Sequence, residues 1–159
     1  MSDRYHARLE IGGPIPAHLF PELVTILQAG GHLYGADKIT SFITPCGTLE
    51  LEDDQAPYGQ FPDLESWLQQ HDIEFDRHSS GWFDTPPVSV HFRRGLGLVD
   101  RPRDREGHAL VRRDGVVEAM KAHASQGDLR AALTCVVGPD IPPLQPVNLF
   151  PDPKEKDTP

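Results

Sequence analysis

Several short segments of the chain alternate polar with apolar side chains, and histidines and carboxylates occupy many of the polar positions. In a β-strand, every second side chain points to the same face of the sheet. Side chains opposite each other on neighbouring strands lie about 4.5–5.5 Å apart. Carboxylates and imidazoles at that spacing can bind a divalent metal ion or transfer protons. The polar positions of these segments are His6, Arg8, Glu10, Glu50, Glu52, Glu74, Asp76, His78, Ser89 and His91.

The strand register decides which of these side chains meet. Phe75 and Val90 both point toward the expected core, so we expect them to pair. Their polar neighbours then meet on the other face, Glu74 beside His91 and Asp76 beside Ser89. This arrangement supports one hypothesis, a metal-dependent hydrolase that uses a cluster of Glu74, Asp76, His78 and His91.

The opposing interpretation is a polar sheet face without chemistry. Solvent-facing sheets carry polar side chains as a rule, and histidine–carboxylate pairs stabilise neighbouring strands. The chain has no phosphate-binding Gly-Lys-Ser/Thr loop, no His-Glu-x-x-His, no Gly-x-Ser-x-Gly and no Cys-x-x-Cys. We therefore expect no cofactor and no resident metal ion, and we favour a role other than catalysis.

Charge is distributed unevenly along the chain. There are 24 acidic and 15 basic residues, which gives a formal net charge of -9. Residues 39–76 contain nine acids and no lysine or arginine, whereas residues 77–113 contain eight arginines against four acids. A dipolar distribution of this kind steers encounters with charged partners. The alternative is that the two spans neutralise each other within the folded molecule.

The acidic span favours a small interaction protein that is regulatory or inhibitory. Its carboxylates can dock on a basic protein surface, and a partner that normally binds nucleic acid offers such a surface. One form of this hypothesis is a mobile-element counter-defence protein that mimics a nucleic-acid backbone. Aromatic side chains on loops are frequent interface anchors. The expected docking residues are Glu50, Glu52, Asp53, Asp54, Tyr58, Trp82 and Phe83.

The arginine-rich span provides a third hypothesis, direct nucleic-acid binding. Asp100, Asp104 and Glu106 dilute its positive charge. Sheets that bind RNA stack bases on exposed aromatic side chains, whereas the expected polar face carries acids in those places. The sequence therefore disfavours direct nucleic-acid binding. If it occurs, the expected phosphate contacts are Arg93, Arg94, Arg101, Arg103 and Arg105.

Composition narrows the class of protein. Sixteen prolines and fourteen glycines among 159 residues indicate many turns and exclude a coiled coil. No apolar run approaches the roughly 20 residues of a membrane-spanning helix, so we expect no membrane association. Residues 1–10 are polar and alternating, which predicts that they are not a secretory signal. Two widely spaced cysteines, Cys46 and Cys135, then predict free thiols and a cytoplasmic location.

The elements that must position these residues follow from periodicity. Alternation predicts strands over residues 4–11, 73–77 and 88–92. Apolar residues three and four apart predict helices over residues 16–29 and 62–71. Residues 32–44 are ambiguous, but a strand near their end is expected to form a hairpin with residues 48–52, and residues 53–60 are expected to form a loop. The order βαββαβ, with an extra edge strand, predicts an α+β, ferredoxin-like fold whose antiparallel sheet has helices on one face and solvent on the other.

The C-terminal third is less regular. Residues 93–115 have the composition of an arginine-rich loop, with a short strand at 109–111. Helices are expected over residues 116–125 and 129–137, and these would form a small, close-packed hairpin that completes a single domain of residues 1–137. Seven prolines among residues 138–159 predict an extended tail in the polyproline II conformation.

Overall fold

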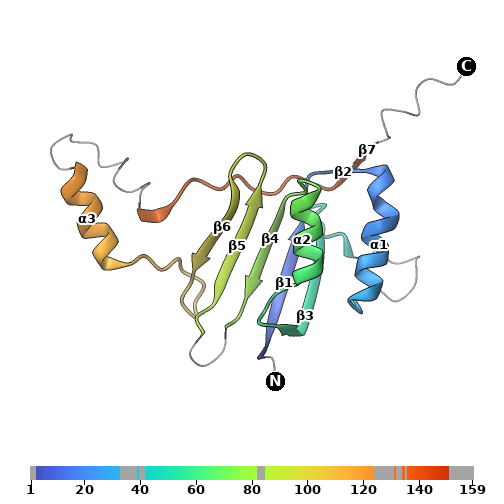
Figure 1. Ribbon diagram of the computed structural model, residues 1–159, viewed down its shortest axis with the longest axis horizontal. Coiled ribbons are helices and arrows are strands. Elements are labelled where there is room, and N and C mark those ends of the chain that lie inside the picture. The colour runs from blue at the N-terminus through green and yellow to red at the C-terminus, as the bar shows by residue number, and fades with distance from the viewer. Residues whose placement is uncertain are drawn as a thin grey trace, which may run out of the picture.

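A five-stranded antiparallel sheet forms the centre of the molecule (Figure 1). The computed structural model describes residues 3–32, 39, 42–81, 85–123, 131, 134 and 136–150. From one edge of the sheet to the other, the strands are β3 (Leu49–Pro57), β1 (Arg4–Ile11), β4 (Phe75–Ser79), β5 (Val88–Arg93) and β6 (Gly97–Pro102). Each strand runs antiparallel to its neighbours. The predicted α+β class with an antiparallel sheet is confirmed.

Two helices, α1 (Phe20–Ala29) and α2 (Pro62–Gln70), pack on one face of this sheet. Leu23 and Leu27 lie one turn apart on α1 and are fully buried, and Leu64 and Leu68 repeat that spacing on α2. They share one hydrophobic core with the inward-pointing strand residues, among them the fully buried Phe75. The core therefore lies between the helices and the sheet, and it fixes which strand residues point the other way.

The N-terminal elements follow the sequence pattern closely. β1 occupies the predicted range, and α2 ends one residue before the predicted end. The helix predicted over residues 16–29 is divided, because a 3₁₀ turn, η1 (Ala17–Leu19), precedes α1. Pro21 lies in the first turn of α1. Proline fits there because the first backbone N–H groups of a helix have no partner within it.

The expected hairpin around Cys46 is only partly described. Ile43 forms an isolated bridge with Leu49, but residues 33–38, 40 and 41 lie outside the described part of the chain. The ferredoxin-like order βαββαβ is therefore not confirmed. Cys46 is exposed and carries a free thiol, whereas Cys135 lies outside the described residues.

β3 is longer than predicted and forms one edge of the sheet. The expectation of a loop over residues 53–60 was wrong, because β3 continues to Pro57 in register with β1. The pairing shifts between Tyr5 and Ala7, which leaves Asp54 and Gln55 in a bulge. Acidic and amide side chains have low strand propensity, so the sequence pattern ends before the strand does.

β4 and β6 also differ from the prediction. β4 begins at Phe75 rather than at residue 73. The expectation of an irregular loop over residues 93–115 was wrong, because residues 97–102 form β6 after a tight turn that contains Gly95 at φ +79°. Glycine adopts this conformation without the steric penalty of a side chain. A bridge between Arg103 and Ala109 takes the place of the short strand expected at residues 109–111.

The third helix, α3 (Arg113–His123), lies beyond β6 and away from the core (Figure 1). Val117 and Met120 on this helix are 40% and 56% exposed, so α3 lacks the close packing expected of a helical hairpin. Only residues 131, 134, 136 and 137 of the second expected helix are described, and these are helical. The hairpin is not confirmed. No described helix has the length and apolar character needed to cross a membrane.

The proline-rich tail lies on the molecule itself as far as residue 150. Residues 138–147, which we call the strap, cross the sheet and lead to β7 (Asn148–Phe150) (Figure 1). β7 pairs in parallel with β2 (Pro14–Pro16). Ile141, Leu144 and Val147 are partly buried, whereas the prolines between them are exposed. This period of three is that of polyproline II, which the sequence predicts for the tail.

Candidate functional site

The face of the sheet opposite the helices carries the polar residues that alternate with the core, and we call it the polar face. Strand pairing arranges eight of these residues in two rows across β3, β1, β4 and β5. One row is Glu50, Glu10, Asp76 and His91, and the other is Glu52, Arg8, His78 and Ser89. The alternation in the sequence therefore places all eight on one face, as expected.

The expected register between β4 and β5 was wrong by two residues. Phe75 pairs with Phe92 rather than with Val90, and the two phenyl rings stack with centroids 5.8 Å apart. Both registers direct Phe75 to the core, so alternation alone does not distinguish them. As a result Asp76 faces His91, whereas Glu74 precedes the first residue of β4.

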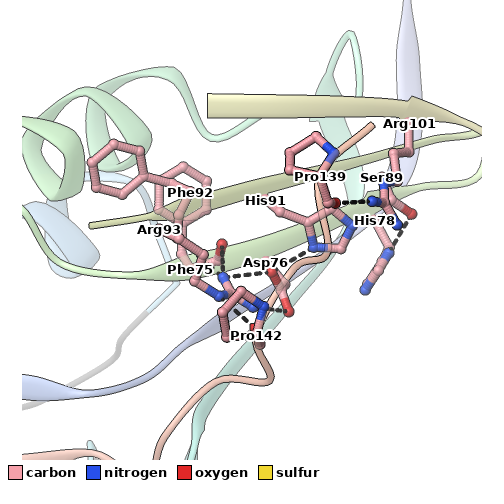
Figure 2. Close-up of polar contacts among 10 residues, drawn as sticks. All are labelled: Phe75, Asp76, His78, Ser89, His91, Phe92, Arg93, Arg101, Pro139 and Pro142. Carbon is pink, nitrogen blue, oxygen red and sulfur yellow. Dashed lines mark hydrogen bonds and ion pairs between the residues drawn. The ribbon is translucent and has the colours of Figure 1, made fainter. Parts of the chain in front are cut away.

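Two neighbours on β5 hold the carboxylate of Asp76 (Figure 2). Asp76 Oδ1 lies 2.6 Å from His91 Nδ1 and 2.8 Å from Arg93 Nη1, and Arg93 Nη2 donates to Oδ2 at 3.0 Å. Burial by itself raises the pKa of Asp76, but the hydrogen bonds from His91 and Arg93 outweigh burial, and the pKa is lowered. Both carboxylate oxygens are therefore engaged by neighbouring side chains.

Arg93 also ties the strap to the sheet. Arg93 Nε donates to the carbonyl oxygen of Pro142 at 2.8 Å, and Nη1 donates to two backbone carbonyls of the sheet. On the neighbouring strand, Arg101 Nη2 donates to the carbonyl oxygen of Pro139 at 2.5 Å (Figure 2). His91 and Arg93 are only 8% and 3% exposed. The expectation that the whole polar face is open to solvent was therefore wrong.

A glycine allows the strap to approach β1 closely. Gly13 donates its backbone N–H to the carbonyl oxygen of Gln145 at 2.7 Å, and Asn148 donates to the carbonyl oxygen of Gly13 at 3.1 Å. A Cβ atom on Gly12 would lie 2.5 Å from the oxygen of Gln145, which is well inside van der Waals contact. The absence of a side chain at Gly12 therefore permits these hydrogen bonds.

His78 and Ser89 form the second polar pair between β4 and β5. His78 Nδ1 lies 2.7 Å from Ser89 Oγ, and the rings of His78 and His91 meet edge to face with centroids 5.9 Å apart. Burial lowers the pKa of His78, and the positive charge of Arg103 lowers it further. Ser89 has no exposed surface, and its hydroxyl group holds the His78 ring in this arrangement.

The four residues of the hydrolase hypothesis, Glu74, Asp76, His78 and His91, do not converge on a common ligand position. Among the described residues, one group of three possible metal ligands has its atoms within 4.8 Å of one another, and that group is Asp104, Glu106 and His108. It lies in the turn after β6 and shares no member with the four. Hydrogen bonds within this turn already engage Asp104.

Arginines neutralise part of the acidic span. Four of the nine acids in residues 39–76 form ion pairs with arginines of neighbouring elements. The pairs are Glu50–Arg8, Glu65–Arg77, Asp72–Arg94 and Asp76–Arg93. The alternative that the two spans neutralise each other therefore holds for Glu65, Asp72 and Asp76, and Arg8 on β1 neutralises Glu50. The surface charge of the acidic span depends on the acids that remain.

Three consecutive acids on β3, Glu52, Asp53 and Asp54, make no ion pair with an arginine among the described residues, and we call them the acidic edge. The side chain of Asp54 is 88% exposed, and Asp54 Oδ1 lies 3.9 Å from His6 Nε2. Asp53 Oδ1 accepts a hydrogen bond from the backbone N–H of Gln55 at 2.7 Å, which holds the bulge. The negative charge of the acidic span is thus concentrated at an outer edge of the sheet.

Of the three aromatic docking residues expected from the sequence, the structure describes only Tyr58. Tyr58 directly follows β3 and is 56% exposed, at a positive φ of 53°. Trp82 and Phe83 lie outside the described residues. A hollow of about 450 Å³ lies beside β3, and it is lined by Phe42, Ile43, Thr44, Pro45, Glu50 and Glu52.

The five arginines of the nucleic-acid hypothesis do not form one basic surface. Arg93 is buried against Asp76 and the strap, and Arg94 pairs with Asp72. Arg101 binds the strap. Arg103 and Arg105 line a separate cleft at the other end of the polar face. The described residues therefore offer no continuous track for a phosphate backbone.

This cleft was not predicted from the sequence. It encloses about 450 Å³ between β1, β4, β5 and the turn after β6, and its polar lining includes His6, Arg8, His78, Arg103, Asp104 and Arg105. Recognising it requires β6, because that strand returns the turn of residues 103–107 to the polar face. The alternation of Leu98 and Asp100 with Val99 and Arg101 is too weak in apolar residues to predict the strand.

Comparison with known proteins identifies no relative. No family model matches the chain, and neither a curated protein nor a solved structure is similar to it at a significant level.

Proposed function

We propose that this protein is a small regulatory interaction protein that docks through its acidic edge on the basic surface of a protein partner. The observation that supports the proposal is the run of Glu52, Asp53 and Asp54 on the outer strand of the sheet, which has no arginine partner in the described part of the chain. Carboxylates grouped in this way attract a basic surface over several ångströms and set the orientation of the encounter.

The hollow beside β3 supports the same partner chemistry. Phe42 and Ile43 provide apolar walls, and Glu50 and Glu52 provide carboxylates at the same opening. Lysine and arginine side chains combine an apolar stem with a charged head, so they match this combination. Exposed Tyr58 lies at the end of the same strand and adds a large contact surface of the kind that anchors interfaces.

A partner that binds nucleic acid fits this surface, since its own binding site presents lysines and arginines. Occupying that site would exclude nucleic acid and inhibit the partner, which is the counter-defence form of the proposal. The free, exposed thiol of Cys46 suits a reducing compartment, and we place the interaction in the cytoplasm.

The test compares two triple variants of the full chain that lose the same charge. The edge variant is Glu52→Gln, Asp53→Asn and Asp54→Asn, in which the amide oxygen at position 53 still accepts the hydrogen bond of the bulge. The control variant is Asp114→Asn, Glu118→Gln and Asp140→Asn, three exposed acids on α3 and the strap. Each tagged protein is used for affinity capture from a lysate of the native host at low salt, with and without added nucleic acid.

We expect the wild type and the control variant each to retain one protein at stoichiometric yield. We expect the edge variant to lose at least about tenfold of that yield, and added nucleic acid to displace the partner. Equal capture by the edge variant contradicts the proposal, because the acidic edge would then contribute nothing to docking. Equal loss in both variants contradicts it as well, because net charge alone would then explain the binding.

A further inference from the structure

The cleft at the end of the polar face has an excess of positive charge. Arg8, Arg103 and Arg105 line it together with two histidines, and Asp104 is the one carboxylate among the described lining residues. Arg8 is already paired with Glu10 and Glu50. Arg103 and Arg105, in contrast, make no ion pair with a carboxylate among the described residues.

Among the described residues, Asp104 makes no ion pair with either arginine, and its oxygens are engaged within the turn. Asp104 Oδ1 accepts the backbone N–H groups of Glu106 at 2.9 Å and His108 at 2.8 Å, and Oδ2 lies 3.0 Å from His108 Nδ1. The backbone hydrogen bond from His108 lowers the pKa of Asp104, so the carboxylate is charged and committed to its own turn.

Two guanidinium nitrogens at the cleft lack a hydrogen-bond acceptor within the described part of the chain. Arg8 Nε and Arg103 Nε are both inaccessible to solvent and unpaired. The orientation of Arg103 is nonetheless fixed, since Arg103 Nη1 donates to the carbonyl oxygen of Gly107 at 3.1 Å. Arg103 thus presents a positioned guanidinium group at the wall of the cleft, and charge-assisted hydrogen bonds from such a group suit an anion.

We infer that this cleft binds a small molecule that carries a phosphate monoester, with Arg103 and Arg105 contacting the phosphate and His78 lying beside it. Planar guanidinium groups suit phosphate because they donate parallel hydrogen bonds to two oxygens. The volume of about 450 Å³ lies within the range of small-molecule sites and leaves room for a body beyond the phosphate. Pro87 and Val88 provide the apolar part of the lining for that body.

The same geometry disfavours a nucleic-acid strand. No phenylalanine, tyrosine or tryptophan is among the described residues that line the cleft, so bases would have no stacking platform. Arg93 and Arg94 are engaged in ion pairs elsewhere, so they do not extend the positive charge of the cleft. The cleft shares no residue with the acidic edge, so the two proposals stand or fall separately.

Calorimetric titration of the full chain tests this inference. The probes are ribose 5-phosphate, inorganic phosphate, ribose and a short single-stranded DNA. The first variant is Arg105→Gln, since Arg105 is exposed and its replacement should leave the fold intact, and the second is Arg103→Gln. Arg112→Gln is the matched control, because it removes the same charge from an exposed position outside the cleft.

Ribose 5-phosphate is expected to bind, ribose is not, and Arg105→Gln should weaken binding by at least about tenfold. Arg103→Gln should act in the same direction, whereas Arg112→Gln should leave the affinity within about twofold. Three results overturn the inference: no binding of ribose 5-phosphate or phosphate at millimolar concentration, equal weakening by Arg112→Gln, or DNA that binds more tightly the longer the strand. The last result would assign the cleft to nucleic acid instead.

Sulfate provides a second readout, because it stays doubly charged between pH 6 and pH 8. A bound dianion favours protonation of His78, so sulfate should bind more tightly at pH 6 than at pH 8. The groups around His78 are Arg8 and Glu10 on β1, Asp76 on β4, His91 and Ser89 on β5, and Arg103 after β6, and His6 lines the same cleft. The pH dependence of sulfate binding should become flatter in His78→Gln, and an unchanged slope would remove His78 from the site.

Discussion

Asp76 and His91 face each other across β4 and β5, with 2.6 Å between Asp76 Oδ1 and His91 Nδ1. Arg93 closes the other side of the same carboxylate and reaches the strap through the carbonyl oxygen of Pro142. Asp76 and His91, which most resembled catalytic residues in the sequence, therefore belong with Arg93 to a cluster that joins β4, β5 and the strap. The acidic edge and the cleft include neither Asp76 nor His91.

Replacing Arg93 with methionine should destabilise the protein by about 3–5 kcal/mol, because the partly buried carboxylate of Asp76 loses its ion pair. Denaturant unfolding measures this change. The double variant Arg93→Met, Asp76→Leu removes both charges and should recover a large part of the loss. A single variant that unfolds within about 1 kcal/mol of the wild type would show that the pair does not hold this region.

Replacing Gly12 with alanine should displace the strap. The added Cβ would lie 2.5 Å from the oxygen of Gln145, and overpacking of this kind destabilises by about 1–3 kcal/mol. Hydrogen exchange at residues 139–147 should accelerate. The control is Gly115→Ala, which has nothing within 4 Å of its new Cβ and lies inside α3, so stability should stay equal or rise. Unchanged exchange in the Gly12 variant would contradict the described path of the strap.

The lowered pKa of His78 predicts a loss of stability in mild acid. The unfolded chain, where histidine has a pKa of about 6.5, binds this proton more tightly than the folded chain does. The contribution of His78 to the free energy of unfolding is therefore complete above about pH 6.5 and is lost as the pH falls toward the lower pKa that His78 has in the folded protein. Denaturant unfolding across this range should show a smaller slope for His78→Gln, which keeps a hydrogen-bonding side chain beside Ser89. An identical slope in both proteins would contradict the burial of His78.

Acids of the same span should differ sharply in their effect on stability. Glu65→Gln should cost about 3 kcal/mol, because Arg77 is buried and its Nε lies 2.9 Å from Glu65 Oε1. Asp54→Asn should change stability by less than about 0.5 kcal/mol, since that side chain is 88% exposed. Thermal or denaturant unfolding compares the two directly. A large loss in the Asp54 variant would show that this acid stabilises the fold instead of remaining available for a partner.

Period-two and helical patterns predicted the elements that surround the core. β1, α2 and β5 bury regular sets of apolar residues, and burial is what the pattern reports. The same alternation grouped Glu10, Asp76 and His91 on one face. The sequence did not predict the roles of these residues, because alternation determines the face on which a residue lies but not which residue it meets on the next strand.

The sequence-based predictions that were wrong share one physical cause, because the features they missed depend on contacts between residues distant in the sequence. The bulge at Asp54 and the strand β6 are held by pairing with neighbours, against weak local propensity. The ion pairs of Arg8, Arg77 and Arg93 depend on strand order, which the count of charges does not contain. The cleft lies between β1, β4, β5 and the turn after β6, so no single segment of the sequence predicts it.

The central claim is that the acidic edge is the docking surface, and hydrogen exchange of the protein with and without its captured partner tests it most directly. The account predicts that exchange slows over β3 and residues 42–48, while α3 keeps its free rates. Slowing confined to α3 or the strap, with β3 unchanged in a saturated complex, would contradict the account.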